Sequence, residues 1–202
     1  MKKQMLLLLA AMVMFQLQAQ KIKVTDGDLN FLKGEEFIDI TFTYDEDLKV
    51  GKLTEDKYIQ QKMAVAEEDE PGAGERWKKA WYEDRPVHFE PKFQELLNRY
   101  TEDADVIFRP GIDEAKYKMI VNTIFIEPGF NVGVARKSAS VDLEILIVPI
   151  DNDGEILAKI LILAAPGKSM SYGDYDVGIR VGEGYAKAGK ELGKFLIKKK
   201  AF

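Results

Sequence analysis

The only histidine of the chain, His88, lies close in sequence to two carboxylates, Asp84 and Glu90. A histidine hydrogen-bonded to a carboxylate can act as a general base. However, no serine or cysteine stands beside them in a recognisable nucleophile setting, and a histidine in an aromatic segment more often packs with one hydrogen bond. We therefore expect a structural role for His88, and the sequence predicts no catalytic residue and no enzyme activity.

A second group of residues that could take part in binding or chemistry lies in the segment 169–176, which mixes tyrosines with carboxylates as sugar-binding loops do. The predicted ligand-binding residues are Tyr172, Asp174, Tyr175, Asp176 and, just beyond the segment, Arg180. They would serve a small-ligand or glycan-binding protein, or conceivably a hydrolase. The alternative is structural, because acids at the start of a helix accept backbone N–H bonds and the tyrosines could cover the edge of the core.

Residue spacing favours neither a metal site nor a nucleotide site. One histidine cannot build a His-rich metal site, and the acidic run from Glu67 to Glu70 lacks the ligand spacing of an EF-hand. Gly72 and Gly74 have neither the lysine and further glycine of a P-loop nor a strand before them. We therefore predict no metal and no cofactor, and expect residues 67–74 to form an exposed loop.

Small residues gather on one flank of the last predicted helix. At about 100° per residue they share a face; they are Gly178, Gly182, Ala186, Gly189 and Gly193. Glycine costs about 1 kcal/mol relative to alanine inside a helix, so this face needs a reason, such as the close approach of another segment. That segment could belong to the same chain, or the face could be an interface with an envelope protein or with a second copy.

Lysines of the same helix concentrate toward its C-terminal end, where positive charge interacts favourably with the helix dipole. They are Lys187, Lys190, Lys194, Lys198, Lys199 and Lys200. We expect them to face solvent, and the alternative is a local patch for anionic lipid head groups. The formal net charge of −5 argues against nucleic acid as the main partner.

The N-terminal residues have the pattern of a secretory signal peptide. The basic pair Lys2–Lys3 precedes an apolar run from Leu6 to Phe15, and Ala19 is a small residue at a suitable cleavage position. The run is too short to span a bilayer. We therefore predict a signal peptide at 1–19 and a mature chain that begins near Gln20, with no transmembrane segment.

The chain contains no cysteine. Thiol redox chemistry is therefore excluded, and so is the lipidated cysteine of a lipoprotein. Exported proteins without disulfides are common in bacteria, whereas small exported eukaryotic domains usually carry disulfides. We expect a bacterial protein that is periplasmic or secreted.

Hydrophobic periodicity predicts the elements that would position these groups. The first two strands should pair in parallel, because a helical crossover joins them, and the last three should form an antiparallel meander. Pro86 should close the second helix. Helices are predicted at 54–65, 75–82, 91–100 and 177–200, and strands at 36–44, 105–108, 117–126, 140–150 and 155–165.

Together these elements predict a single α+β domain over residues 20–202. It would contain a mixed sheet of about five strands, with helices mainly on one face of the sheet. A chain of this length can bury a substantial core as one domain.

Four segments together resemble a family of small exported proteins of Gram-negative bacteria. They are WKKAW at 77–81, EPKF at 90–93, IEPGFNVG at 126–133 and GYAKAGKELG at 184–193. The resemblance covers the mature chain and implies an exported location and a fold, but no activity. The element order is also similar to that of the α/β domains of the curli secretion lipoprotein and of the TolB N-terminal region. That analogy implies action through protein contacts in the envelope, although the chain lacks a lipidated cysteine.

The function that we predict from these observations is that of a non-enzymatic, exported cell-envelope protein that binds another protein or itself. The contact would use the glycine face of the last helix or a free edge of the sheet. The alternative is a periplasmic small-ligand or glycan-binding protein that uses the segment 169–176.

Overall fold

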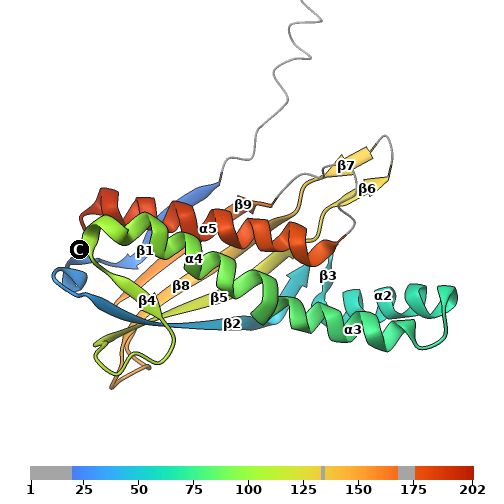
Figure 1. Ribbon diagram of the computed structural model, residues 1–202, viewed down its shortest axis with the longest axis horizontal. Helices are drawn as coiled ribbons and strands as arrows, with labels where there is room; N and C mark the ends of the chain where they lie inside the picture. The colour runs from blue at the N-terminus through green and yellow to red at the C-terminus, as the bar shows by residue number, and fades with distance from the viewer. Residues whose placement is uncertain (1–19, 133–134, 168–175) are drawn as a thin grey trace, which may run out of the picture.

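The computed structural model describes residues 20–132, 135–167 and 176–202. They form two layers, a mixed seven-stranded sheet and a layer of helices on one of its faces (Figure 1). The predicted α+β class, with helices mainly on one face, is confirmed. The strands of this sheet are β1 (Lys21–Gly27), β2 (Phe37–Val50), β3 (Leu53–Thr54), β4 (Ile107–Arg109), β5 (Tyr117–Glu127), β8 (Ser140–Pro149) and β9 (Ala158–Pro166).

The strand order is β1-β9-β8-β5-β2-β3, and β4 lies beside β2. Strand β2 runs parallel to both β4 and β5. Strands β5, β8 and β9 form an antiparallel meander, and β1 pairs antiparallel with β9. The predicted parallel pair and the predicted meander are therefore both present, and β1 and β3 account for the strands beyond the predicted five. A separate hairpin contains β6 (Phe130–Val132) and β7 (Ala135–Lys137).

The helices are α2 (Glu55–Asp69), α3 (Ala73–Asp84), α4 (Glu90–Thr101) and α5 (Val177–Lys199). Helices α4 and α5 lie side by side over the sheet, whereas α2 and α3 form a hairpin that extends past its end (Figure 1). All the predicted helices are present. Helix α5 is also the longest element of the helical layer and borders both α4 and β1, so its two sides have different neighbours.

The segment 67–74 is not the exposed loop that the sequence predicts. Helix α2 continues to Asp69 and α3 begins at Ala73, so only a tight turn separates them. The Glu67 carboxylate closes this turn by accepting the N–H groups of Gly72 and Gly74 at 2.8 and 3.1 Å. These two hydrogen bonds lower the pKa of Glu67. The acidic run therefore stabilises a helix end.

Pro86 does not close the second helix either. The chain stays helical across it, through a π-helical turn at Arg85–Phe89 that joins α3 to α4. Proline has no N–H to donate, and the wider π-helical turn accommodates it without ending the helical path. As a result, α3 and α4 form one long bent helical segment.

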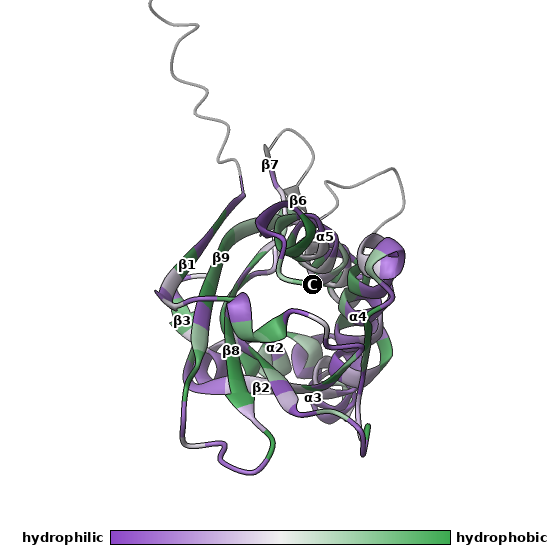
Figure 2. Cartoon of the chain, turned by 90° about the vertical axis from the view of Figure 1, so that its left-hand side faces the viewer, coloured by the Kyte–Doolittle hydropathy of each residue, from purple (hydrophilic) through white to green (hydrophobic). Residues whose placement is uncertain are grey.

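The core fills the space between the sheet and the helices. One side of each central strand is fully buried, for example Val141, Leu143, Ile145 and Ile147 of β8, whereas Asp142 and Glu144 lie on the opposite face, as the alternation predicts. The stripe of α5 that meets the sheet is buried as well; it contains Val181, Tyr185, Ala188, Leu192 and Leu196. Figure 2 shows the sheet on one side and the helices on the other.

Candidate binding site

Strand β1 lies at one edge of the sheet and pairs only with β9 in the described part of the chain. Ile22 and Val24 turn toward the helical layer and are partly buried against the core, while Lys21, Lys23 and Thr25 are exposed. This alternation is typical of a strand with one dry face. The outer edge of β1 therefore presents backbone N–H and C=O groups that no described strand takes up.

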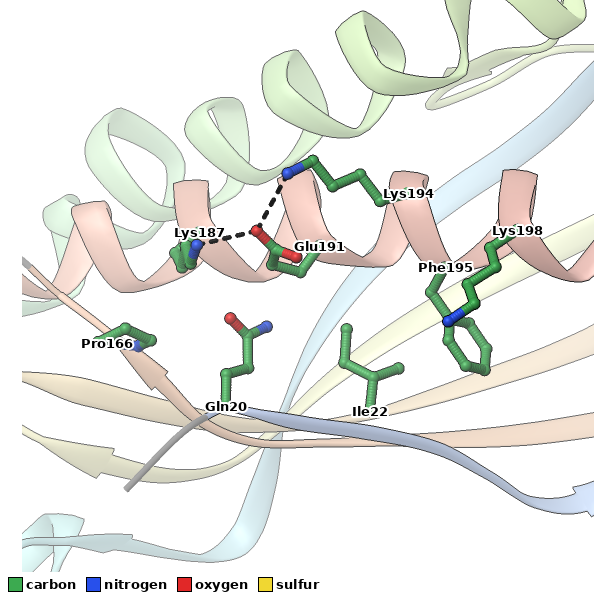
Figure 3. A pocket seen from close by; sticks show the side chains of 8 residues that line it. All are labelled: Gln20, Ile22, Pro166, Lys187, Glu191, Lys194, Phe195 and Lys198. Atoms are coloured by element: carbon green, nitrogen blue, oxygen red, sulfur yellow. Dashed lines mark hydrogen bonds and ion pairs between the residues drawn. The ribbon is translucent and has the colours of Figure 1, made fainter. Parts of the chain in front are cut away.

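A groove runs beside this edge, between β1 and the C-terminal half of α5 (Figure 3). We call it the β1–α5 groove. Its volume is about 540 Å³, and its lining residues are Gln20, Ile22, Pro166, Lys187, Glu191, Lys194, Phe195 and Lys198. Figure 3 shows that the helix supplies the charged side chains from above, while the strand side supplies Gln20, Ile22 and Pro166. Ile22 and Phe195 also pack against the core, so they form an apolar floor.

The groove carries more positive than negative charge. Glu191 is its single carboxylate, and the Lys187 and Lys194 ammonium groups lie 2.8 and 3.6 Å from its Oε1. Partial burial raises the pKa of Glu191, but the hydrogen bond and charge of Lys187 and the charge of Lys194 outweigh this effect, so the pKa lies below its usual value. Lys198 has no ion pair with any described residue. The lysines therefore outnumber the carboxylates that could neutralise them.

Gln20 adds an unusual polar group to the same groove. Both its side-chain nitrogen and its side-chain oxygen are shielded from solvent, and neither makes a hydrogen bond within the described residues. Figure 3 shows the amide directed from the strand toward the helix. Buried amides in proteins nearly always have partners, so this one needs an explanation.

The opposite side of α5 carries the glycine face, and the structure shows what covers it. A Cβ atom on Gly189 would lie 2.1 Å from the Phe93 carbonyl oxygen, and one on Gly182 would lie 3.0 Å from the His88 carbonyl oxygen. A Cβ atom on Gly193 would likewise lie 2.9 Å from the Tyr100 Cβ. The α4 side of the molecule therefore approaches the α5 backbone closely at these positions.

This packing corrects the hypothesis that the glycine face is an interface with another molecule. Gly178, Gly182, Gly189 and Gly193 are buried within the chain, as the alternative interpretation holds. Only Ala186 of that set borders an open surface, a second hollow of about 460 Å³ next to Lys92, Glu183 and Lys190. The other predicted contact surface was a free edge of the sheet, and the described strands have such an edge at β1.

The predicted ligand segment is described only in part, because Tyr172, Asp174 and Tyr175 lie outside the described residues. Asp176 caps α5: its Oδ1 accepts the N–H groups of Gly178 and Ile179 at 2.8 and 3.4 Å. This is the structural role that the sequence offers as an alternative. Arg180 is 7% exposed and donates hydrogen bonds to the Pro128 carbonyl oxygen, which ties α5 to the end of β5.

His88 lies beside the start of α5 and pairs with Asp84. Its Nδ1 is 2.8 Å from Asp84 Oδ1, and the Asp84 carboxylate occupies the space where a side chain on Gly178 would project. Burial raises the pKa of Asp84, the charge of Asp176 adds to the rise, and the His88 hydrogen bond opposes it. Glu90, the other carboxylate near His88 in sequence, binds the Tyr44 hydroxyl instead.

A buried polar network next to this pair was not predicted from the sequence. Arg85 donates to both oxygens of Glu55 at 2.8 and 2.7 Å, and its guanidinium stacks 3.7 Å from the Tyr44 ring centroid. The Trp81 indole N–H also donates to Glu55, at 2.7 Å. Burial raises the pKa of Tyr44 and of Tyr185 strongly. These contacts hold the α2–α3 hairpin to the sheet, and no local motif marks them because their partners are distant in sequence.

The β1–α5 groove was also not predicted, although its strand has a visible signal. Ile22 and Val24 alternate with Lys21, Lys23 and Thr25 directly after the predicted leader, and this is the period of a half-buried strand. The alternation is short, so the predicted leader and the turn residues after it obscure it. The lysines of α5 were predicted as a solvent-facing set, without the strand that faces them.

None of the helices within the described residues has the length and apolar character needed to cross a membrane. Nor do the described residues contain a cluster of histidine, aspartate and glutamate suited to holding a metal ion.

Neither a protein-family model nor a curated protein sequence matches the chain. Among solved structures, the PelC dodecamer from Paraburkholderia phytofirmans is similar at 11% identity with a TM-score of 0.41, covering 86% of this chain and 97% of that one. A DUF330 protein from Xanthomonas campestris is similar at 18% identity with a TM-score of 0.34, covering 52% of this chain and 58% of that one. Both scores are low, so we transfer nothing from those proteins to this chain.

Proposed function

We propose that this chain is a non-enzymatic, exported bacterial protein that binds another protein by accepting an extended segment along β1. The observation that carries the proposal is the unpaired outer edge of β1 beside the β1–α5 groove. A strand added to a sheet edge gains main-chain hydrogen bonds, and a neighbouring groove receives its alternate side chains.

The edge has features that make such binding selective. Lys21 and Lys23 stand exposed on the strand, and the register of β1 shifts between Val24 and Asp26. Exposed lysines and bulges discourage indiscriminate pairing between sheet edges. A segment that pairs with β1 therefore needs additional contacts, and the groove is the surface that can supply them.

A proline scan of β1 tests the proposal with its own internal control. Neighbouring residues of an antiparallel edge strand point their N–H groups alternately toward the sheet and away from it. Proline at 21 or 23 and proline at 22 or 24 therefore remove N–H groups on opposite sides. One pair should destabilise the fold by breaking the β9 pairing, and the other should leave it folded but block strand addition.

The readout is photo-crosslinking in the native host, with the crosslinking residue at position 25 and, as a control, at Lys57 on α2. We expect an adduct at position 25 that maps to an extended segment of one protein and disappears with the outward-facing proline. Adducts that persist with that proline, or that form equally at Lys57, would contradict strand addition. An adduct with a second copy of this chain would identify self-association as the function.

One observation favours a second candidate, a small-ligand site at the start of α5. Asp84, His88 and Asp176 gather there from separate parts of the chain, next to the buried Arg180. A thermal-shift screen against glycans and small anions tests it, because a ligand that binds only the folded state raises the melting temperature. An unchanged melting temperature across the screen would leave these groups with a structural role only.

A further inference from the structure

The charges of the β1–α5 groove identify the chemistry of the segment that would occupy it. We propose that the groove binds an acidic extended segment, whose carboxylates pair with Lys187, Lys194 and Lys198 while its backbone adds to β1. This inference rests on the proposed function and deepens it, because strand addition alone does not specify which side chains the segment presents.

The first support is the excess of ammonium groups over carboxylates. Glu191 is shared between Lys187 and Lys194, and Lys198 is left without an ion pair among the described residues. The chain as a whole is acidic, with a formal net charge of −5, so a groove rich in lysine is a local reversal of sign. Such complementarity directs the choice of partner more than it adds to raw affinity.

The second support is that the row of lysines and a short strand have comparable lengths. Lys187, Lys194 and Lys198 lie on one side of α5 and span about 16 Å along it at 1.5 Å per residue. Side chains on one face of a strand recur about every 6.6 Å. Three alternate side chains therefore cover about 13 Å, which equals the length of β1 from Lys21 to Thr25 and is slightly shorter than the row of lysines.

The third support is the unpaired amide of Gln20. Its nitrogen and oxygen are both shielded and both lack partners among the described residues. Because Gln20 lines the groove, a rotation of its side chain would bring an amide that can donate and accept to the backbone of an added segment. If export removes the leader before Gln20, the new α-ammonium group adds positive charge at the same end of the groove.

An anionic lipid surface is the competing occupant for a set of lysines. It would use the charges but not the unpaired edge of β1, nor the apolar floor formed by Ile22 and Phe195 between strand and helix. An acidic extended segment uses all three features. We therefore favour the segment, and lipid binding becomes an outcome of the test.

The test compares three labelled octapeptides that alternate valine with glutamate, with glutamine or with lysine. The full chain is expressed with its leader and purified as the host leaves it, and binding is measured by fluorescence anisotropy. We expect the glutamate peptide to bind at least about tenfold more tightly than the glutamine peptide at low salt. High salt should reduce this difference, because it screens exposed charges.

The variant Lys198→Glu should lower the preference for glutamate over glutamine, and Lys194→Glu should lower it further when added. Lys57→Glu is the matched control, since it makes the same charge change on exposed α2, away from the groove. Each variant is checked for its melting temperature. A preference that survives both groove substitutions would overturn the inference.

The two proposals fail in different ways. Equal binding of the glutamate and glutamine peptides, abolished by the outward-facing proline in β1, would overturn the charge inference and leave strand addition standing. Absence of binding by all three peptides would overturn both. Binding to phosphatidylglycerol vesicles that Lys198→Glu abolishes, without peptide binding, would assign the lysines to a membrane surface.

Discussion

The two sides of α5 differ in how closely their neighbours approach. On one side, glycines let the π-helical turn and α4 contact the helix backbone, with the Phe93 carbonyl oxygen 2.1 Å from where a Gly189 Cβ would lie. On the other side, long side chains face β1 across a groove of about 540 Å³. Because the π-helical turn and α4 pack against the helix backbone at these glycines, the glycine side stabilises the fold. Under the proposed function, binding uses the lysine side.

The largest expected effect on stability tests the glycine side of α5. Gly189→Ala should lower the free energy of unfolding by about 3 kcal/mol, because the added methyl group collides with a backbone oxygen that cannot move without shifting α4. Urea denaturation followed by circular dichroism measures the change.

Gly184→Ala is the matched control on the same helix. Its Cβ atom would lie 3.3 Å from the Ala165 carbonyl oxygen, a contact that a small shift relieves. Alanine is the better helix former, so we expect a change within about 1 kcal/mol. Equal losses in the two variants would show that the close approach at Gly189 is not what distinguishes the two sides.

The lysine side of α5 should tolerate truncation of a side chain better than the glycine side tolerates an added methyl group. Phe195→Ala removes a partly buried ring from the floor of the groove, and we expect a loss of about 1–2 kcal/mol of stability. The variant should stay folded while its binding to the glutamate peptide weakens. Unfolding of this variant would mean that the floor is part of the core, and the contrast between the two sides would fail.

The two sides of α5 should differ in the direction in which stability changes with pH. Asp84 lies on the glycine side. Burial raises the pKa of Asp84 in the folded chain. This group therefore favours folding below its unfolded pKa, about 3.9, and that contribution is lost as the pH rises through the folded value. We expect wild type to lose stability relative to Asp84→Asn as the pH rises from about 4 to 6. A gain in the stability of wild type relative to Asp84→Asn over this pH range would contradict the assignment.

Glu191 lies on the lysine side of α5. It should give the smallest effect, and its contribution to stability should change with pH in the opposite direction. Lysine contacts hold its pKa below the usual value, against the effect of partial burial. Its contribution is present above the unfolded pKa of about 4.3 and is lost as the pH falls through the folded value. Relative to Glu191→Gln, the free energy of unfolding of wild type should rise by less than about 1 kcal/mol from about pH 3 to 6. The rise is small because Glu191 and its lysine partners are partly exposed. Urea titrations over this range measure it.

Local patterns predicted most of the fold. Periodicity places each buried stripe correctly, as in Val141 to Ile147 of β8, because a half-buried strand repeats its environment every second residue. It failed at Pro86, where a π-helical turn keeps the chain helical. It also failed at Glu67, whose carboxylate closes a turn between two helices. At both places the local backbone geometry differs from the preference of the residue type, and at Glu67 two side-chain hydrogen bonds account for the difference.

The candidate site could be predicted only in pieces. The sequence identifies the glycine face and the lysines of α5, but it does not say which segment faces each of them. The covering segments are α4 and β1, and both lie far from α5 in the chain. Contacts of this kind depend on the whole topology, so the predicted interface was placed on the side of the helix that is in fact buried.

The position of β1 has a consequence for how the groove comes into existence. The first strand of the sheet in sequence pairs Lys21 with Leu163, so its partner is among the last strands to be synthesised. Such long-range pairing forms slowly, and β1 cannot pair with β9 until β9 has been synthesised. Since α5 follows β9, the groove has no second wall until α5 has been synthesised. A chain that stops before α5 would therefore lack this surface and could not bind the proposed segment.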